Sequence, residues 1–478
     1  MNILNKLSVA LAAILISAEA FAGGLMTNTN QSASFLRSVA RGTSLDPDAV
    51  YFNPAGVVFM ENGFHIGLSN QTAYQTRTIN STFAPFAMNA NTLGNPNKEY
   101  VGTAFAGFIP SLQFAWKHDR WAVMASVGVN GGGGSLEFKN GLGSFERQFA
   151  VLPVGVNQLG SALGLSASQY SMDMYLKGKS MTLAFNVGGA FRITDWLSVA
   201  AMVRFSSTSN GYTGYLKNIS INPTMAALGL NGAMMPAASF FSAVGAQLGA
   251  MSPELAQTAL TYAALTSDHT LEVEQKGISI SPVIALSFHK DNWDASIKYE
   301  FKMGTELKIK SSEASAKDPV INAIFPDGTT VKSETPALLA TAVSRQCGPV
   351  KVTAEYHCFF DKGAENSFSS AVKGNTMEYL LGAEWDITDK WTASAGTQRT
   401  QLNLDEKAYS DMNFSLSAWS FGVGFAYRIT DGIRLNVAYM PTLYDKVTNS
   451  SVTADGVEFK DIYSRTSNAV GIGLDFKF

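Results

Sequence analysis

Apolar and polar residues alternate along most of the chain downstream of residue 62. The alternation is clearest in 182–193, 293–302, 420–428 and 470–478, where one face is apolar and the other is small or polar. Successive side chains of a β-strand point to opposite faces, so this period of two predicts strands with one apolar side. A transmembrane barrel turns that side toward lipid. A soluble sandwich turns it toward a core, so the alternation alone leaves both folds open.

The tight turns between these strands distinguish the two folds. Similar sequences recur at 192–196, 386–391 and 428–432, with relatives at 118–121 and 290–293. Four of the seven tryptophans directly follow one of these turns, namely Trp121, Trp196, Trp293 and Trp391. Aromatic residues at one level form a girdle at a membrane interface, which a sandwich core does not need. The turns therefore favour a transmembrane barrel.

Long connections alternate with the short turns, which is the layout of outer-membrane barrels. They lie at about 79–99, 133–173, 220–268, 311–330, 363–373, 404–413 and 447–459. We predict an all-β fold, a fourteen-stranded antiparallel transmembrane β-barrel with strands 62–78, 100–117, 120–132, 174–193, 196–219, 269–289, 292–310, 331–346, 349–362, 374–387, 390–403, 414–429, 432–446 and 460–478. The last strand ends on Phe478, which suits recognition by the barrel-assembly machinery.

Residues 1–22 have the composition of a secretory signal peptide. A short polar and basic opening precedes the apolar run 7–17, and Ala20-Phe21-Ala22 fits a signal-peptidase site. The apolar run is shorter than the roughly 20 residues of a membrane-spanning helix. Export and the barrel pattern together predict a multi-pass β-barrel in the outer membrane of a Gram-negative bacterium.

Composition excludes several other classes of protein. The formal net charge of −3 leaves no basic surface for nucleic acid. Cys347 lies at a tight turn, and Cys358 lies about ten residues along the following strand. A strand rises ~3.3 Å per residue, so the two cysteines are too far apart for a disulfide, and we expect free thiols. No cluster of histidine, cysteine and aspartate has the spacing of metal ligands, and we expect neither a metal nor a cofactor.

Outer-membrane phospholipases and deacylases are the competing class, because they are barrels with a serine and a histidine on the wall. The chain has five histidines: His65, His118, His269, His289 and His357. No serine occupies a position that demands a nucleophilic role beside one of them. We therefore predict no catalytic residue and no enzymatic activity.

Residues 46–56 interrupt the regular pattern. This stretch contains Asp-Pro and Asn-Pro, which favour turns over strands, and it lies between the export signal and the first strand. We predict that 23–61 form a plug inside the lumen and that 62–478 form the barrel. Val50, Tyr51 and Phe52 then become candidates for the wall of a ligand pocket.

The chain resembles the FadL/TodX family of outer-membrane transporters for long-chain fatty acids and other hydrophobic compounds. The resemblance rests on Asn53-Pro54-Ala55-Gly56 after Asp48-Ala49, on Phe108-Ile109-Pro110 followed by 119–123, and on the glycine-rich 128–134. It implies a plugged fourteen-stranded barrel that captures a hydrophobic ligand with apolar loop helices. The ligand passes to a pocket between barrel and hatch and leaves sideways through a kink in the third strand. The hatch and gating residues implied are Asn53, Pro54, Ala55 and Gly56.

The connection 220–268 is unusually apolar for an extracellular loop. Its candidates for ligand capture are Leu228, Leu230, Met234, Met235, Phe240, Phe241 and Leu248. Helix starts are expected at Asn222-Pro223, at Pro236 and at Ser252-Pro253, where proline follows a capping residue or opens the helix. This apolar face would capture a ligand, or it would pack on the barrel mouth.

Glycines and inward cations supply the remaining candidates. Gly128, Gly131 and Gly132 mark either the wall kink or a flexible loop root. Arg204, Lys298 and Lys302 point inward by alternation. Each would meet a ligand carboxylate, or it would form a salt bridge in the lumen with a neighbour such as Asp294 or Glu300.

These features predict passive, ligand-gated uptake of hydrophobic molecules across the outer membrane. Long-chain fatty acids are the default cargo, and aromatic hydrocarbons or other apolar compounds are the alternative. A non-transporting adhesin or structural barrel is the alternative of another class. The expected partners are a hydrophobic small molecule, outer-membrane lipid and lipopolysaccharide, with no nucleic acid, and the expected state is a monomer.

Overall fold

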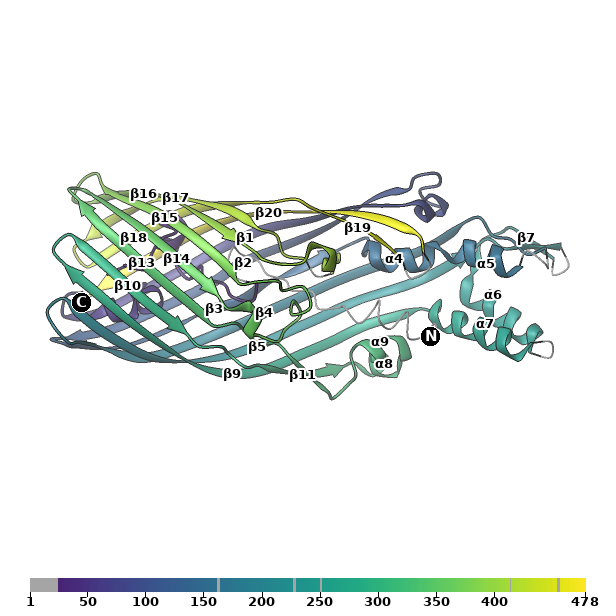
Figure 1. Ribbon diagram of the computed structural model, residues 1–478, viewed down its shortest axis with the longest axis horizontal. Coiled ribbons are helices and arrows are strands. Elements are labelled where there is room, and N and C mark those ends of the chain that lie inside the picture. The colour runs from purple at the N-terminus through teal and green to yellow at the C-terminus, as the bar shows by residue number, and fades with distance from the viewer. Residues whose placement is uncertain (1–24, 161–163, 227–228, 250–251, 413, 454–455) are drawn as a thin grey trace.

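One closed antiparallel barrel accounts for most of the chain (Figure 1). The computed structural model describes residues 25–478 except 161–163, 227–228, 250–251, 413 and 454–455, so the predicted signal peptide lies outside the described residues. The main sheet has eighteen strands. Four of them are short segments that extend longer strands: β8 (Met235–Pro236), β11 (Glu306–Ser311), β12 (Thr330–Lys332) and β19 (Val447–Val452). The other fourteen form the barrel wall.

The wall strands follow one another around the barrel in chain order. They are β1 (Gly63–Phe83), β2 (Asn97–His118), β3 (Trp121–Phe138), β4 (Tyr170–Arg192), β5 (Leu197–Ile221), β9 (His269–Lys290), β10 (Trp293–Glu300), β13 (Leu338–Cys347), β14 (Val350–Phe359), β15 (Thr376–Asp386), β16 (Trp391–Gln401), β17 (Ala418–Thr430), β18 (Ile433–Tyr444) and β20 (Glu458–Lys477). β20 pairs with β1 from His65↔Lys477 to Phe83↔Phe459 and closes the barrel. The predicted fourteen-stranded fold is confirmed.

One predicted strand, 292–310, is interrupted. β10 ends at Glu300, and β11 resumes at Glu306. Both pair with β9 on one side, and on the other side β10 pairs with β13 and β11 with β12. Met303 contacts Thr335 as an isolated bridge within the break. Alternation in the sequence does not reveal this interruption, because the strand resumes beside the same neighbouring segments.

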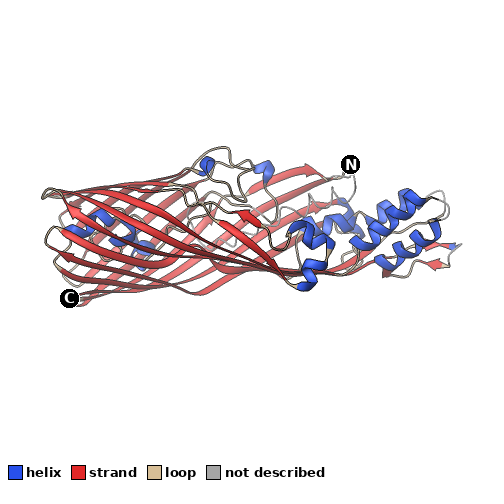
Figure 2. Ribbon diagram, turned by 90° about the horizontal axis from the view of Figure 1, so that it is seen from below, coloured by secondary structure: helices blue, strands red, loops and turns tan. Residues whose placement is uncertain are grey.

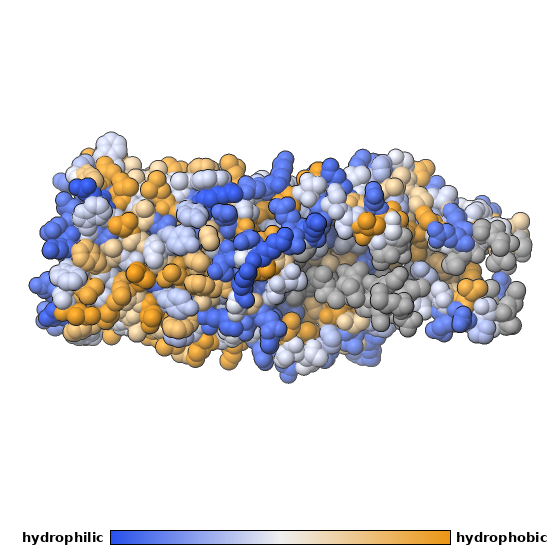
Figure 3. All heavy atoms as spheres, viewed as in Figure 1, coloured by the Kyte–Doolittle hydropathy of each residue, from blue (hydrophilic) through white to orange (hydrophobic). Residues whose placement is uncertain are grey.

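The barrel exterior is apolar where the short turns lie. Figure 3 shows apolar residues gathered over the end that carries the C-terminus in Figure 1. Phe185, Ile280 and Ile472 are among the exposed apolar side chains of the wall, and the four turn tryptophans are 37–46% exposed. These positions match a lipid-facing belt with an aromatic girdle. Among the described residues, no helix is both long and apolar enough to cross a membrane.

Helical connections gather at the opposite end of the barrel (Figure 2). They are α4 (Gly143–Ala150), α5 (Leu152–Gly160), α6 (Ala237–Leu248), α7 (Pro253–Leu265), α8 (Glu313–Lys317) and α9 (Pro319–Ile324), with the short 3-10 helix η2 (Ala84–Met88). The helix starts expected at Pro236 and Ser252-Pro253 are found. The start expected at Asn222-Pro223 is wrong, because Thr224 exchanges backbone hydrogen bonds with Ser166 and begins β6 (Thr224–Met225), which pairs with β7 (Leu230–Asn231).

The N-terminal segment 25–60 lies inside the barrel. It contains α2 (Ala33–Ser38), α3 (Ala49–Phe52) and the 3-10 helix η1 (Pro54–Phe59), and almost all of its residues are buried. α2 packs on strands of the C-terminal half, β15 to β18 and β20, while η1 packs on β4, β5 and β9. We call this segment the hatch.

Glycines on the inner wall allow α2 to approach closely. A Cβ atom would lie 2.3 Å from Ser38 O at Gly382, 2.1 Å from it at Gly396 and 2.4 Å from Leu36 O at Gly422. A larger side chain at any of these positions would push the helix backbone away from the wall. Gly382, Gly396 and Gly422 of β15, β16 and β17 therefore form the surface on which α2 packs, and we call this surface the glycine seat.

Candidate functional site

Strand pairing between β2 and β3 is interrupted in the barrel wall. Their ladder runs to Phe105↔Ser135 and resumes at Leu112↔Val127, so residues 106–111 and 128–134 form no ladder pair with each other. Pairing of β3 with β4 shifts register twice in the same stretch, before Gly131 and after Gly132. Gly132 has a φ of 66°, which favours glycine. The predicted kink glycines Gly128, Gly131 and Gly132 all lie in this stretch, which we call the wall gap.

The hatch closes the wall gap from the lumen. Asn28 N donates to Asn130 O at 2.8 Å, and Asn28 Nδ2 and Gln31 Nε2 donate to Val129 O at 3.0 and 2.7 Å. On the other side, Ser111 Oγ and Gln113 Nε2 donate to Gln31 O at 2.7 and 3.0 Å. Residues 28–31 thus satisfy the backbone carbonyl groups of Val129 and Asn130 at the interrupted part of the ladder.

An aromatic cluster lies behind the wall gap. Phe35 and Phe52 stack with ring centroids 5.4 Å apart, and Tyr51 meets Phe52 edge-on at 5.1 Å. Ile109 and Val129 of the gap belong to the same buried cluster. The pocket candidates Tyr51 and Phe52 therefore lie in one cluster with residues of the wall gap. The third candidate, Val50, packs in a separate cluster with Ala55 and Val57.

Two of the three candidate cations meet at Tyr51. Lys298 Nζ lies 4.5 Å from the Tyr51 ring centroid and donates to Tyr51 O at 2.9 Å, and the Arg204 guanidinium lies 5.6 Å from that ring. Both cations also form ion pairs with Glu300. The expected salt bridge in the lumen is therefore present, with Glu300 as its acid.

The third cation, Lys302, lies apart from this group. It follows the end of β10, where alternation no longer fixes direction, and its side chain is 46% exposed and pairs with Glu334 at 2.9 Å. Asp294, the other acid considered, pairs with Lys351 at 2.9 Å and with His289 at 2.5 Å.

The tetrapeptide Asn53-Pro54-Ala55-Gly56 forms a compact turn on β5. Asn53 Nδ2 donates to Ser44 O at 3.2 Å, and Ser198 Oγ donates to Ala55 O at 2.6 Å. Pro54 opens η1, where its missing N–H costs nothing. A Cβ at Gly56 would lie 2.1 Å from Asn53 Nδ2, so the Asn53 side chain occupies the space that glycine leaves.

Comparison with solved structures identifies the fold. A FadL homologue of Pseudomonas aeruginosa has a TM-score of 0.60 at 14% identity, over 95% of this chain and 100% of that one. The toluene transporters TodX of Pseudomonas putida and TbuX of Ralstonia pickettii have TM-scores of 0.52 and 0.50 at 13% and 14% identity. They cover 91% and 96% of this chain, and 95% and 99% of their own chains. The chain has the FadL-type fold. No protein-family model and no curated protein matches the sequence.

An ionic network anchors the hatch of this FadL-type barrel. Glu384 forms ion pairs with the buried Arg37 and Arg41 at 2.6 and 2.8 Å, and Arg41 also pairs with Asp46 and Asp48 at 2.7 and 2.9 Å. From another strand, Glu355 Oε2 accepts from Arg41 N and Gly42 N, both at 2.8 Å. These anchors were not among the predicted residues, although two arginines in an otherwise apolar stretch were a visible signal.

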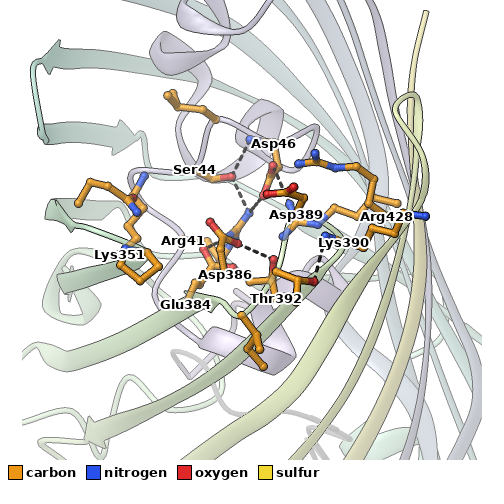
Figure 4. A pocket seen from close by; sticks show the side chains of 16 residues that line it. Arg41, Ser44, Asp46, Lys351, Glu384, Asp386, Asp389, Lys390, Thr392 and Arg428 are labelled. Carbon is orange, nitrogen blue, oxygen red and sulfur yellow. Dashed lines mark hydrogen bonds and ion pairs between the residues drawn. The ribbon is translucent and has the colours of Figure 1, made fainter.

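The end of the FadL-type barrel beside the short turns is strongly charged. A cavity of 560 Å³ there is lined by side chains of both signs, including Arg41, Asp46, Lys351, Glu384 and Arg434. Figure 4 shows the Arg41 side chain surrounded by Ser44, Asp46 and Glu384, with Lys351 and Arg428 at the sides. An apolar molecule would gain little burial in this cavity.

The capture candidates divide between core and surface. Phe240 and Phe241 are buried, and Phe241 stacks on Tyr262 of α7 with centroids 5.2 Å apart, so these two pack at the barrel mouth. Leu230 and Met235 are partly buried against the same cluster, whereas Met234 is 39% exposed. Leu228 and the side chain of Leu248 lie outside the described residues.

Proposed function

We propose that this protein lets hydrophobic molecules cross the outer membrane of a Gram-negative bacterium passively, and that the cargo leaves through the wall gap into the membrane. The observation that carries the proposal is the interrupted ladder between 106–111 and 128–134, with aromatic side chains behind it and hatch residues 28–31 hydrogen-bonded across it. The likeness in fold to a FadL homologue and to toluene transporters supports it.

The side chains beside the two possible exits favour the route through the wall gap. Phe105 and Phe108 beside the wall gap are 63% and 72% exposed on the outer surface, where they would meet lipid tails. The alternative exit leads through the charged cavity around Arg41 and Glu384. Each Å² of apolar surface kept out of water is worth about 25 cal/mol. A ligand that leaves sideways into lipid keeps this stabilisation, whereas a ligand that leaves through the charged cavity loses it.

Gating then consists of moving residues 28–31. The five hydrogen bonds that hold them across the wall gap are each worth about 1 kcal/mol net, so opening costs on the order of 5 kcal/mol. A ligand lowers this cost only if it binds the open state more tightly than the closed one. The ring cluster of Phe35, Tyr51 and Phe52, which contacts both the hatch and the gap, is where such a difference would arise.

Long-chain fatty acids are the cargo that we propose first. Arg204 and Lys298 beside Tyr51 supply positive charge next to apolar surface. Aromatic hydrocarbons are the second candidate, favoured by the stacked rings and by the two similar toluene transporters. Uptake of radiolabelled palmitate and of radiolabelled toluene into proteoliposomes separates the two, and uptake of neither would favour a non-transporting barrel.

A reversible crosslink tests the exit route. In a background with Cys347 and Cys358 replaced by alanine, Gln31→Cys with Gly128→Cys places one thiol on the hatch and one on the gap, at positions where the Gln31 side chain reaches Gly128. We expect oxidation to abolish uptake and reduction to restore it. The single variants Gln31→Cys and Gly128→Cys, oxidised under the same conditions, are the controls and should transport normally, because neither can form the crosslink. Full uptake by the oxidised first pair would disprove exit through the gap.

A further inference from the structure

Four lysines lie together on the outer surface of the barrel, on strands that neighbour one another in the wall. Their ladder rows run from β4 through β5 and β9 to β11 (Figure 1). One row places Lys179 and Lys310 on either side of Glu274, and the adjacent row places Lys276 directly opposite Lys308. All four lysines are exposed, and we call them the lysine patch.

The lysine patch lies at the border of the lipid-facing belt. The outward residues of β9 change from charged to apolar after Lys276 and stay apolar from Ile278 to Phe288. At ~3.3 Å per residue and a strand tilt of about 40°, this stretch covers roughly 25 Å across the membrane, which is the height of the apolar band of such barrels. On β4 the same change occurs between Lys179 and Met181. The patch therefore lies at the level of the lipid headgroups, on the side of the long loops.

Positive charge in the lysine patch exceeds the negative charge beside it. Lys276 forms an ion pair with Glu274 at 2.6 Å, and within the part of the chain that the structure describes it is the only one of the four lysines with such a partner. Lys276, Lys310 and Lys179 all act electrostatically on this one carboxylate. Like charges directly opposite each other in a sheet repel, as Lys276 and Lys308 do. A bound anion would relieve that repulsion.

The neighbouring rows do not neutralise the patch. Further from the belt, Lys177 of β4 shares a row with Glu272 of β9. On the other side, Glu306 of β11 is the ladder partner of Lys332. Each of these acids thus has a lysine in its own row, and the four patch lysines with Glu274 keep a net positive charge.

β5 leaves open space between the lysine of β4 and those of β9 and β11. Its outward residues in the two rows are Ser209 and Gly211. Apart from Gly211 and its chain neighbours, no heavy atom of the described residues lies within 4 Å of a Cβ added there. The strands that close the barrel differ at this border, because β1 and β20 present the uncharged outward pairs Tyr74↔Asn468, Thr76↔Thr466 and Thr78↔Ser464.

We propose that the lysine patch binds the phosphate groups of the glycolipid in the outer leaflet of the outer membrane. Ammonium groups form charge-assisted hydrogen bonds with phosphate, and clustered lysines at a membrane surface attract anionic headgroups. The headgroup would lie over Ser209 and Gly211, and its acyl chains would lie against Ile278 and Ile280, which are 82% and 58% exposed. This inference is independent of the transport function, because it concerns how the barrel contacts its own membrane.

Lipid binding to the detergent-solubilised barrel tests this site. Native mass spectrometry compares bisphosphorylated lipid A with the same lipid after removal of its phosphates. Lys276→Gln with Lys308→Gln removes the directly opposed pair, and Lys446→Gln with Lys460→Gln removes two exposed lysines near the loop ends of β18 and β20 as the matched control. We expect the first variant to bind lipid A about tenfold to thirtyfold more weakly than the wild type, and the control to bind it within twofold.

Three results would overturn the site. They are unchanged lipid A binding by the first variant, an equal loss of binding in the control variant, and wild-type protein that binds phosphate-free lipid or phosphatidylglycerol as tightly as lipid A. If the glutamine variants do not assemble, acetylation of the wild type with and without lipid A decides. Protection of Lys276 and Lys308, with Lys446 and Lys460 labelled as before, supports the site, and unchanged labelling of Lys276 and Lys308 refutes it.

Discussion

Single buried residues of the hatch act by fixing the conformation of its backbone, and not by presenting side chains at a surface. Asn53 fills the space above Gly56 and ties the chain to Ser44, and Pro54 fixes the entry into η1. Both residues are buried and neither contacts the wall gap directly. Their effect on transport would therefore pass through the shape of the hatch.

Asn53→Ala and Pro54→Ala should reduce hydrophobe uptake while leaving the barrel intact. Alanine at 53 removes the hydrogen bond to Ser44 O, worth about 1 kcal/mol, and loosens the turn. Uptake assays and heat-modifiable mobility on gels measure the two properties separately. A variant that fails to assemble would show that the tetrapeptide serves folding and not gating.

Asp361 should make the loop after β14 sensitive to pH. Burial raises the pKa of Asp361 to about 6, while its carboxylate accepts from Thr376 N at 2.7 Å. Because the folded state binds this proton more tightly than the unfolded chain, stability should fall as pH rises from about 4 to 6. Asp361→Asn should remove that dependence and add up to about 3 kcal/mol at neutral pH. Thermal midpoints on either side of the window provide the measurement, with the exposed-turn variant Asp431→Asn as the control.

Among the elements, the strands were predictable and the irregular segments were not. Alternation and turn sequences located every wall strand, since a half-buried strand imposes a period of two. Glu300 was named in advance as a possible partner of the inward cations. The pairing of Arg41 with Glu384 was not predictable, because the two residues are 343 positions apart and meet only in the folded barrel. Asn28, Gln31 and Phe35 carry no periodic signal, so their places at the wall gap required the structure.

The bend in β3 depends on Gly132. Alanine there would require a φ near 66° and would place Cβ 2.4 Å from Ser180 O, which should destabilise the barrel by about 1–3 kcal/mol. Urea unfolding followed by tryptophan fluorescence measures this loss. Gly211→Ala in β5, where nothing lies within 4 Å of the added methyl group, is the matched control. Equal midpoints for the two variants would mean that β3 relaxes without strain.

The whole molecule is a barrel whose plug is held by charge at one end and by close packing along α2. Glu384 joins two hatch arginines to the wall, and the glycine seat at Gly382, Gly396 and Gly422 receives the helix. Neither device includes residues 28–31. Movement of that stretch alone would leave the ion pairs of Glu384 and the glycine contacts of α2 in place.

Glu384→Gln should loosen the entire hatch. Removing one partner from a buried ion network costs about 3–5 kcal/mol, and less here because Glu384 is 19% exposed. We expect increased permeability to small polar solutes, measured by liposome swelling, with the barrel still folded. Glu365→Gln, which removes an exposed partner of Lys332, should have no effect. Equal swelling rates for both variants would show that packing alone retains the hatch.

The contacts of the hatch also constrain how the molecule can be built. η1 rests on β4, β5 and β9, which are synthesised early, while α2 rests on β15 to β18 and β20, which are synthesised last. The final seam joins β20 to β1 and encloses the hatch. Because α2 fits closely against glycine backbone of the late strands, we expect these strands to assemble around a hatch that already contacts the early ones, so that the hatch helps to shape the barrel that encloses it.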